Sequence, residues 1–406
     1  MVKRARVVVV GAGFAGLAAT KRLARAGALV TLVDRNPYST FQPLLYQVAT
    51  AGMGLSDVSY PIRTFAAKWP NVRTRRATLT RVLADERRVE FEDGTGLDYD
   101  YLVLATGVTT NWLGIEGAEA NALPIYSLHD AAALRDRLGQ YLEDTALGRR
   151  KSTHVVVVGA GATGVEMAGT LAELRRRTLP LTHPEIGPDR TSVTLVERFE
   201  YVLAPYKPRL RDATAAALRR RGVKLRLSST VAAVEEDAVL LSDGTRLPSD
   251  LTVWALGVTA PEQVGSWGLE QGKGGRITLT DALNVPGHPE IFVAGDLSGQ
   301  PEAQPQLAQP AIQMGDHAGR QIAAAIQGRP PQRFSYRDPG IMATVGKGEA
   351  VLQLPNGLTV RGFPAWLVWI FIHVSYLLGG RNRASVLLNF FWRYAGPRRS
   401  ATSVSR

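Results

Sequence analysis

The sequence predicts an α/β chain in which one βαβ domain is inserted into a second, similar domain, with a helical region at the C-terminus. Three observations support this prediction. A glycine-rich pattern between an apolar strand and a helix occurs twice, at residues 11–16 and 159–164. A further strand and helix follow the second copy and are needed to complete the first sheet. Residues 361–406 are aromatic and strongly basic, and they contain no acidic side chain.

In each copy, the residues around the glycines predict a βαβ unit. Residues 6–10 predict an apolar strand, the helix after the glycines extends to about residue 26, and residues 29–34 predict a second strand. In the second copy, strands are predicted at residues 155–158 and 192–197, with a helix to about residue 174 between them. The repeated unit predicts two Rossmann-like domains, each able to bind a dinucleotide.

The repeat extends beyond the glycines and sets the expected domain boundaries. Residues 89–109 align without gaps on residues 239–259, and eleven of the 21 positions are identical. A strand at residues 291–294 and a helix at residues 309–326 are assigned to the first domain, because its sheet otherwise lacks strands. The expected division is residues 1–114 and 286–330 for the first domain, 115–285 for the inserted domain, and 331–406 for the C-terminal region.

The composition restricts the chemistry. The chain of 406 residues has no Cys, which excludes disulfides, thiolate metal sites and redox dithiols. Its six His residues lack the spacing of metal ligands, so we expect no metal site. Any redox chemistry must therefore reside on a bound cofactor. The N-terminus shows no signal-peptide pattern, so we expect the protein on the cytoplasmic side of the membrane.

The C-terminal region predicts an interfacial membrane anchor. The formal charge of the chain is +12, and residues 361–406 contribute seven Arg. The apolar run at residues 365–378 is shorter than the roughly 20 residues that a spanning helix needs. A second helix is expected to place its apolar residues on one face, namely Val386, Leu387, Phe390, Phe391 and Tyr394.

We therefore expect residues 361–396 to lie on the lipid bilayer surface as a helical hairpin. The apolar content of this segment argues against nucleic acid as its partner, although its charge alone would suit one. The alternative is a helical pair that packs on the protein itself or at a dimer interface. The oligomeric state stays open, with a homodimer among the alternatives.

The glycines of each copy have separate structural tasks. The first permits the tight turn from strand to helix, the second lets the backbone approach a pyrophosphate, and the third lets the helix pack closely on the strand. The pyrophosphate then lies at the N-terminus of the helix, where free N–H groups and the helix dipole favour negative charge. The candidate loop residues are Gly11, Gly13, Phe14, Ala15 and Gly16 in the first copy, and Gly159, Gly161 and Gly164 in the second.

An acidic residue ends the second strand of each copy. Asp34 follows Gly16 by eighteen residues, where a carboxylate is expected to bind the ribose hydroxyls of an adenosine. Glu197 is its counterpart in the second copy. A carboxylate at that position repels a 2′-phosphate, which favours NADH over NADPH, whereas Arg198 beside it opposes this preference.

The segments around the two copies indicate which nucleotide each one binds. In the first copy, Thr106 and Gly107 end a strand that approaches the nucleotide, and Gly295 precedes Asp296, whose carboxylate could meet the ribityl or pyrophosphate part of a flavin. The second copy keeps Gly257 but has no equivalent acid. We therefore assign FAD to the first copy and the exchangeable NADH to the second.

At this point the sequence resembles the type II NADH dehydrogenases, single-chain NADH:quinone oxidoreductases, over essentially its whole length. The resemblance implies transfer of hydride from NADH to FAD and of electrons onward to a membrane quinone. It also implies that the C-terminal region, with Trp366, Trp369, His373 and residues 381–383, is a membrane anchor. The motifs that carry the resemblance lie at residues 41–49, 104–107, 294–296 and 308–313.

The resemblance also implies roles for further residues. Residues 308–313 match the element that lines the quinone site, and Gln309 and Gln313 would share one helix face and address the quinone carbonyls. Surface amides are the alternative. Glu166 matches a family glutamate proposed to help proton delivery, but an acid that complements a helix dipole would look the same. The remaining candidate cofactor contacts are Arg35, Gln42 and Ala311.

Three other functions compete with this hypothesis. A soluble reductase for ferredoxin or rubredoxin would need no apolar C-terminal region. A sulfide:quinone reductase shares the anchor but needs cysteines. An NADH-binding flavoprotein with a partner-binding role would turn over slowly. Because no transmembrane helix is predicted, we expect no proton pumping, while the type of quinone stays open.

Overall fold

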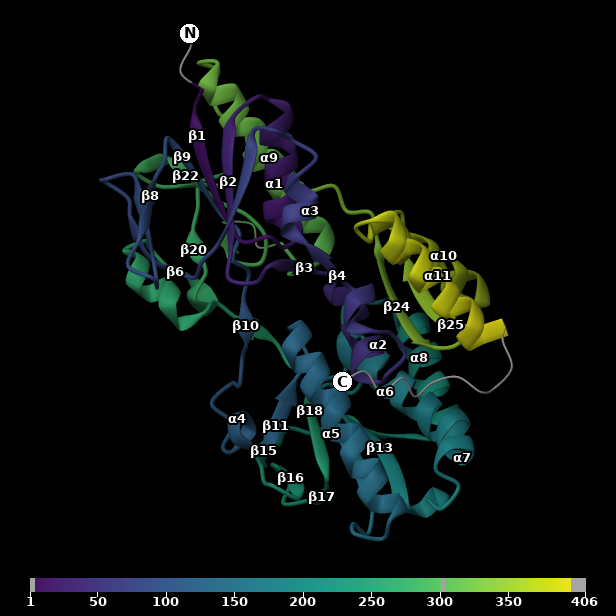
Figure 1. Cartoon of the computed structure of the whole chain (residues 1–406). Helices are drawn as coiled ribbons and strands as arrows, with labels where there is room; N and C mark the ends of the chain where they lie inside the picture. Colours follow the sequence, from purple (N-terminus) through teal and green to yellow (C-terminus); the bar gives the residue numbers. More distant parts are fainter. Residues whose placement is uncertain (1–3, 301, 303, 396–406) are drawn as a thin grey trace. The chain divides into compact units, whose positions relative to one another are not determined.

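The computed structural model describes residues 4–300, 302 and 304–395, and these residues form two compact units (Figure 1). Unit 1 comprises Met1–Ser39, Tyr60–Thr109 and Val258–Pro339. Unit 2 comprises Thr40–Ser59, Thr110–Gly257 and Gly340–Arg406. Each unit has its own sheet and core.

Unit 1 is built on a six-stranded sheet that is parallel except at one edge. Its central strand is β1 (Arg6–Val10), in which Val7 to Val10 are all buried, as expected where helices cover both faces of a parallel sheet. The strand order is β21 (Asn284–Val285), β22 (His288–Val293), β9 (Tyr101–Leu104), β1, β2 (Leu29–Asp34) and β5 (Val72–Arg76). Only β21 runs antiparallel to its neighbour.

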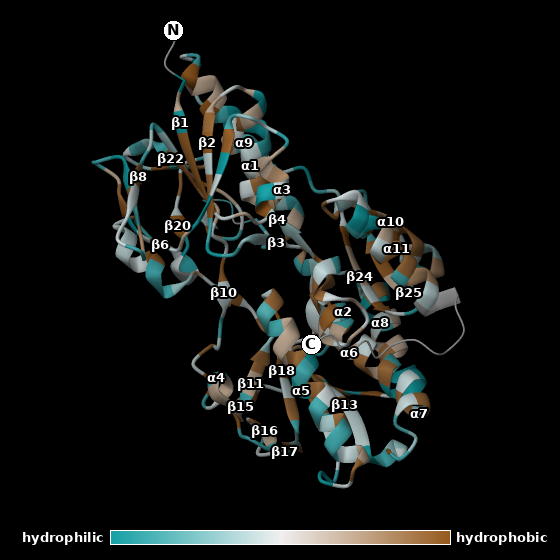
Figure 2. Cartoon of the chain, in the orientation of Figure 1, coloured by the Kyte–Doolittle hydropathy of each residue, from teal (hydrophilic) through white to brown (hydrophobic). Residues whose placement is uncertain are grey.

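Unit 2 repeats this arrangement with five parallel strands. The order is β11 (Ala122–Pro124), β18 (Leu251–Trp254), β12 (Thr153–Val158), β13 (Thr191–Val196) and β14 (Val223–Arg226). Apolar residues concentrate in the strands of both sheets (Figure 2). The principal helices of this unit are α5 (Leu128–Ala146), α6 (Ala162–Glu173) and α8 (Pro208–Arg220). The predicted repeat of the βαβ unit is therefore confirmed.

The aligned segments at residues 89–109 and 239–259 also fold alike. Each contains the last two strands of a three-stranded antiparallel sheet, followed by a strand of the main sheet. In unit 1 the small sheet is β6 (Leu79–Leu83), β7 (Arg88–Phe91) and β8 (Gly96–Asp98). In unit 2 it is β15 (Val231–Val234), β16 (Ala238–Leu241) and β17 (Arg246–Pro248).

Short elements connect these parts. The helices among them are α2 (Leu45–Ala49), α3 (Ile62–Ala66), α4 (Ala118–Asn121) and α7 (Leu179–Thr182). The strands are β3 (Tyr38–Thr40), β4 (Ser59–Pro61), β10 (Thr109–Thr110), β19 (Val258–Thr259), β20 (Ile277–Thr278) and β23 (Ser298–Gly299).

The boundaries of the inserted segment differ from the expected residues 115–285. The chain returns to unit 1 at Val258, and the residues that follow contact that unit: Ser266 Oγ donates to the carbonyl of Thr80, and β21 pairs with β22. Pairing of such a short, polar strand leaves no recognisable periodicity in the sequence. Unit 2 also takes in residues 40–59, which the expected division gave to the first domain.

The C-terminal region contains a sheet that was not predicted. Strands β24 (Ile341–Gly346), β25 (Glu349–Gln353) and β26 (Thr359–Gly362) form an antiparallel meander in unit 2, and two helices follow. Helix α10 spans Phe363–Tyr376 and α11 spans Gly380–Ala395. Among the described residues, no helix is both long and apolar enough to cross a bilayer.

The predicted apolar face of α11 is partly covered by the rest of unit 2. Val386 and Phe390 are buried, whereas Leu387 and Phe391 are about half exposed, at 49% and 59%. The helix therefore has apolar side chains both toward unit 2 and toward solvent. The side chain of Tyr394, the fifth residue of the predicted face, lies outside the described residues.

Polar contacts hold α11 against residues 54–59 of the same unit. The buried carboxylate of Asp57 accepts hydrogen bonds from Ser385 Oγ at 2.6 Å and from Asn389 Nδ2 at 2.8 Å. It also accepts the N–H of Gly54 at 2.9 Å, and Asn382 Nδ2 donates to the carbonyl of Ser59. These bonds fix the position of α11 in addition to its apolar contacts.

Helix α1 (Phe14–Arg25) packs very closely on α9 (Ala308–Ile326) in unit 1. A Cβ placed on Gly315 of α9 would lie 2.0 Å from the carbonyl oxygen of Ala15. Such an approach is possible only at a glycine. The contact holds the return helix against the first glycine loop.

Replacing this glycine should therefore destabilise unit 1. Gly315→Ala is expected to lower the free energy of unfolding by about 1–3 kcal/mol, the usual cost of forcing an extra methyl into a packed contact. Urea denaturation measures the loss. Gly139→Ala in α5 is the matched control, because its Cβ would meet nothing within 4 Å, and it should be stabilising by about 0.5–1 kcal/mol. Equal stability of the two variants would contradict the packing argument.

Candidate functional site

The first glycine loop in unit 1 has the geometry of a pyrophosphate cradle. Gly11 has φ +103°, and a Cβ placed on it would lie 2.2 Å from the carbonyl oxygen of Ala105. A Cβ on Gly16 would lie 1.7 Å from the carbonyl oxygen of Gly11. Gly13 instead faces open space, with no atom within 4 Å of a built Cβ. The N-terminus of α1 carries no side-chain cap, as is usual where a helix N-terminus binds an anion.

The second glycine loop, in unit 2, repeats the same geometry. Gly159 has φ +102°, and its Cβ would lie 2.7 Å from the carbonyl oxygen of Ala255. A Cβ on Gly164 would lie 1.8 Å from the carbonyl oxygen of Gly159, and Gly161 faces open space. Helix α6 also begins without a side-chain cap. Each unit therefore contains one loop whose backbone geometry could admit an anion.

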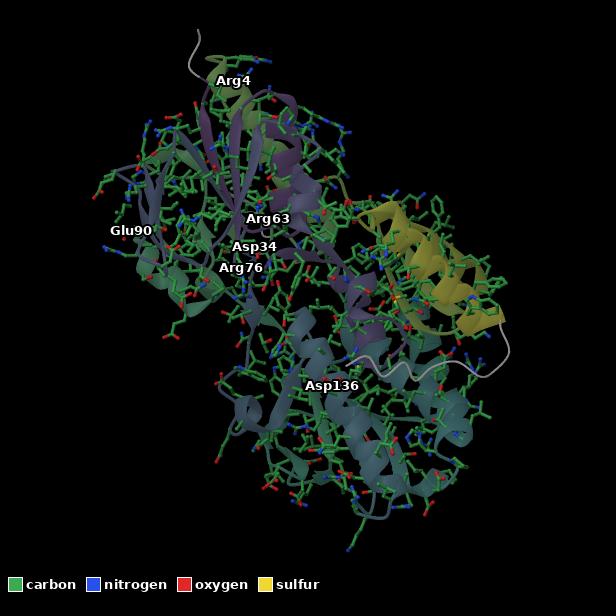
Figure 3. The ribbon with its side chains drawn as sticks, in the orientation of Figure 1. Arg4, Asp34, Arg63, Arg76, Glu90 and Asp136 are labelled. Carbon is green, nitrogen blue, oxygen red and sulfur yellow. The ribbon has the colours of Figure 1, made fainter. Side chains whose placement is uncertain are left out.

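The two acids hold equivalent positions beside these loops. Asp34 ends β2, level with Arg76 on β5 (Figure 3). Its carboxylate accepts the N–H of Ala12 at 2.6 Å and that of Asn36 at 2.8 Å. In unit 2, Glu197 accepts the N–H of Ala160 at 2.7 Å.

Glu197 also accepts a second N–H, from Phe199 at 3.2 Å, so both acids contact the loop of their own unit and the chain two residues further on. Burial raises the pKa of Asp34, against the opposing effect of the N–H groups of Ala12 and Asn36. Two amide donors thus fix the orientation of each carboxylate.

Unit 1 has further polar groups suited to a ligand beside its loop. Burial raises the pKa of Asp296 to about 6, and the charge of Arg276 opposes this rise. The carboxylate of Asp296 accepts no hydrogen bond from any described residue, and the buried Oγ1 of Thr106 also lacks a partner among them. Gly107 and Gly295 have φ of +73° and +83°, which only glycine adopts easily.

The two glutamines of α9 differ in what they contact. Gln313 donates through Nε2 to the carbonyl of Arg337 at 2.9 Å and accepts the N–H of Arg337 through Oε1 at 3.0 Å. Gln309 is half-buried and has no side-chain hydrogen bond to a described residue. One amide therefore fixes the chain around Arg337, whereas the other is available. The buried Ala311 lies between them in the sequence.

Glu166 lies in the first turns of α6, with 8% of its surface exposed. Its Oε1 accepts the N–H of Thr344 on β24 at 3.2 Å. Burial raises the pKa of Glu166 to about 8, while Thr344 and the indole of Trp369 oppose the rise. The buried Nε1 of Trp369 makes no hydrogen bond of normal geometry to a described residue. The carboxyl is therefore mainly protonated at neutral pH.

Aromatic rings of unit 2 surround this carboxyl. Trp369 stacks on His373 at 4.0 Å and packs against Tyr46 at 6.4 Å. His373 donates through Nδ1 to the carbonyl of Trp369, and burial lowers the pKa of His373 to about 4. Burial and the charge of Glu166 raise the pKa of Tyr206. Trp369, His373 and Tyr46 therefore form one aromatic cluster beside the neutral carboxyl of Glu166.

The sequence did not indicate Thr344 or Tyr206 as neighbours of Glu166, nor Tyr46 as a neighbour of Trp369. Thr344 belongs to the unpredicted sheet, and Tyr206 lies in an irregular segment after β13. No spacing rule relates them, because the fold alone brings these segments together. Among the other candidates, Arg35 and Gly257 are exposed, and Gln42 is half-buried in unit 2.

Comparisons with known proteins give consistent results. Residues 5–315 match the family model of the pyridine nucleotide-disulphide oxidoreductases. A type II NADH:quinone oxidoreductase of Mycobacterium tuberculosis is 34% identical, over 99% of this chain and 91% of that protein. One from Staphylococcus aureus is 29% identical, over 86% of this chain and 89% of its own. The solved NDH2 of Plasmodium falciparum in complex with NADH matches 98% of this chain and 100% of its own, with TM-score 0.89 and 18% identity, which shows a common fold.

The raised pKa of Glu166 predicts a pH-dependent stability. Between the ordinary value of 4.5 and about 8, the folded chain binds more protons at this group than the unfolded chain. The free energy of unfolding should therefore fall as the pH rises through this window, by at most about 1.4 kcal/mol per pH unit. Glu166→Gln should remove that fall. In urea titrations, the free energy of unfolding of Glu166→Gln minus that of the wild type should therefore increase from pH 5 to pH 8.

Glu185→Gln, at an exposed carboxylate of the same unit, is the control and should not change the pH dependence. If the curves of the wild type and Glu166→Gln ran parallel, Glu166 would not be protonated in the folded chain at neutral pH.

Proposed function

Since this chain belongs to the type II NADH:quinone oxidoreductases, we propose that unit 1 holds FAD, unit 2 binds NADH, and the C-terminal helices attach to the membrane that contains the quinone. The chain is an NADH:quinone oxidoreductase. The observation that carries the assignment of cofactors is that each unit has a complete loop and acid, while only unit 1 adds Thr106 and Asp296.

The groups in unit 1 fit a noncovalently held FAD. The open face at Gly13 admits a pyrophosphate, and the carboxylate of Asp34 is placed for the ribose of the adenosine. Thr106 Oγ1 and the Asp296 carboxylate, which have no protein partner among the described residues, can bond the remaining polar groups. When bound, FAD supplies the electron chemistry that connects a hydride donor with a quinone.

The loop of unit 2 fits NADH better than NADPH. The open face at Gly161 admits the pyrophosphate, and Glu197 is placed to accept the ribose hydroxyls. The N–H groups of Ala160 and Phe199 hold this carboxylate in place. A 2′-phosphate at the same position would meet its negative charge.

We assign the quinone contact to Gln309 and proton delivery to Glu166. Gln309 has a half-buried amide that is available for a quinone carbonyl, whereas the amide of Gln313 is occupied by Arg337. We therefore give Gln313 a supporting role. Glu166 holds a proton on its carboxyl at neutral pH and can donate it to a quinone oxygen that becomes basic on reduction.

An exposed apolar surface supports membrane attachment by α10 and α11. We call these side chains, each at least 45% exposed, the apolar surface: Phe363, Leu367, Phe371, Tyr376, Leu387, Leu388, Phe391 and Trp392. Arg361, Arg381 and Arg383 are exposed at the ends of the same helices. Apolar side chains with basic residues beside them are typical of a surface that lies in an anionic interface. We place the enzyme at the cytoplasmic face of the cell membrane.

The assignment of Gln309 predicts a defect in one half-reaction. Gln309→Ala should slow reoxidation of the flavin by quinone about tenfold, the loss expected for one hydrogen bond, and leave its reduction by NADH unchanged. Stopped-flow absorbance measures the two steps separately. Gln313→Ala is the comparison. It should lower the midpoint temperature of unfolding, and it should slow reoxidation less than Gln309→Ala does. If the flavin of Gln309→Ala were reduced slowly by NADH and reoxidised at the normal rate by quinone, the assignment of Gln309 to the quinone site would be wrong.

The apolar surface predicts how the enzyme leaves the membrane. Phe371→Ser together with Leu388→Ser should shift the protein from the membrane to the soluble fraction, because burial of each side chain contributes about 2 kcal/mol. Activity toward a lipophilic quinone should fall more than activity toward ferricyanide. Leu147→Ser with Leu181→Ser, at exposed positions elsewhere in unit 2, is the control. Full-length protein that is soluble without detergent would contradict the attachment.

A further inference from the structure

A basic cavity of about 410 Å³ lies in unit 2, away from the glycine loop of that unit. The ends of two helices and one turn form it. Helix α6 continues into a π-helical turn at Leu174–Thr178, and α8 ends at Arg220. The turn joins β24 to β25. The residues that line this cavity are Glu173, Arg176, Arg177, Arg220, Arg221 and Lys347.

The cations of the cavity exceed its carboxylates. Arg220 and Arg221 share the carboxylate of Glu349, at 2.7 and 2.6 Å. Glu173 is engaged by the backbone N–H of Lys347 at 3.0 Å. Even with both carboxylates counted against the five cationic side chains, the cavity keeps a positive charge.

Two of the arginines have no carboxylate partner among the described residues. Arg176 donates to the carbonyl of Arg220 at 2.7 Å, so its charge is not neutralised. Arg177 is exposed and has no side-chain hydrogen bond or ion pair to a described residue. Basic residues at the end of one helix are common, because they complement its dipole. Here two helix ends and a turn place five cationic side chains around one cavity. The dipole of a single helix does not explain such a cluster.

The turn connects this cavity with the apolar surface. A Cβ placed on Gly346 would lie 3.1 Å from Nε of Arg221, and one on Gly348 would lie 3.9 Å from Cδ2 of Phe363. Phe363 begins α10, is 56% exposed and stacks on Trp366 at 5.6 Å. The cavity and the first residue of the apolar surface therefore border the two sides of one short turn.

We propose that this cavity binds the phosphate of an anionic phospholipid headgroup, whose acyl chains lie against the apolar surface that begins at Phe363. The proposal rests on the membrane attachment proposed above. The planar guanidinium group of arginine can donate two hydrogen bonds to the oxygens of one phosphate. Several arginines in one cavity therefore favour a phosphate, with one or two negative charges, over chloride. A free phosphate would use the same side chains, but the adjacent exposed Phe363 gives a lipid additional contacts.

The test compares vesicle binding of matched variants of the full-length, flavin-loaded protein. Binding to phosphatidylcholine vesicles is measured with and without phosphatidylglycerol, by flotation. Arg176→Gln with Arg177→Gln should lower the affinity for the anionic vesicles about tenfold and leave binding to neutral vesicles unchanged. Arg209→Gln with Arg219→Gln removes the same charge from exposed positions on α8 outside the cavity, and should retain most of the affinity. Flavin content and thermal unfolding confirm that both variants fold.

Several outcomes would overturn the proposal. An equal loss in both double variants would show a general effect of net charge. Inorganic phosphate that binds the wild type and not Arg176→Gln with Arg177→Gln, while vesicle binding is unchanged, would show a site for a soluble anion. If the wild type binds neutral vesicles and gains nothing from phosphatidylglycerol, the cavity proposal fails alone. If it binds neither vesicle, the proposed membrane attachment fails instead.

Discussion

The hydrogen bond from a loop amide to an acid on the next strand is the constraint on which both nucleotide sites depend. The carboxylate accepts the N–H of Ala12 in one unit and of Ala160 in the other, at nearly the same distance. This bond fixes the loop relative to the second strand and leaves the N–H groups at the helix N-terminus for a ligand. Gly11 and Gly159 adopt almost the same left-handed φ to permit it. The duplicated geometry therefore follows from one local requirement that is met twice.

The sequence was sufficient to predict these parts because their determinants are local. Strands at residues 6–10 and 29–34, the glycine loops and their acids follow from periodicity and spacing within about 30 residues, and the structure places all of them as predicted. The environment of Glu166 could not be predicted in this way. Its carboxyl meets Thr344 and lies near Trp369, about two hundred residues further along the chain. Only the fold makes these residues neighbours, and no pattern relates them in sequence.

The same distinction explains the errors. Residues 258–285 contain only short elements and join unit 1 through contacts such as Ser266 with Thr80 and β21 with β22, so the inserted segment ends at Gly257. The meander of β24, β25 and β26 was missed because its strands show no regular alternation of buried and exposed residues. The resemblance and the helical spacing of Gln313 indicated a face but not a partner, and the structure adds that its amide bonds Arg337. On α11, the spacing predicted the helix but could not predict that Val386 and Phe390 are buried while Leu387 and Phe391 stay exposed.

The contacts of Asp57 have a consequence for the energetics of adsorption. Because Ser385 and Asn389 bond this carboxylate, α11 is held in place before any lipid is present. Many amphipathic segments become helical only on contact with lipid and lose conformational entropy at that moment. Helices α10 and α11 have already lost this conformational entropy during folding. Its adsorption should therefore proceed as rigid-body docking, without a gain in circular-dichroism helicity and with a heat-capacity change that reflects only the apolar area covered.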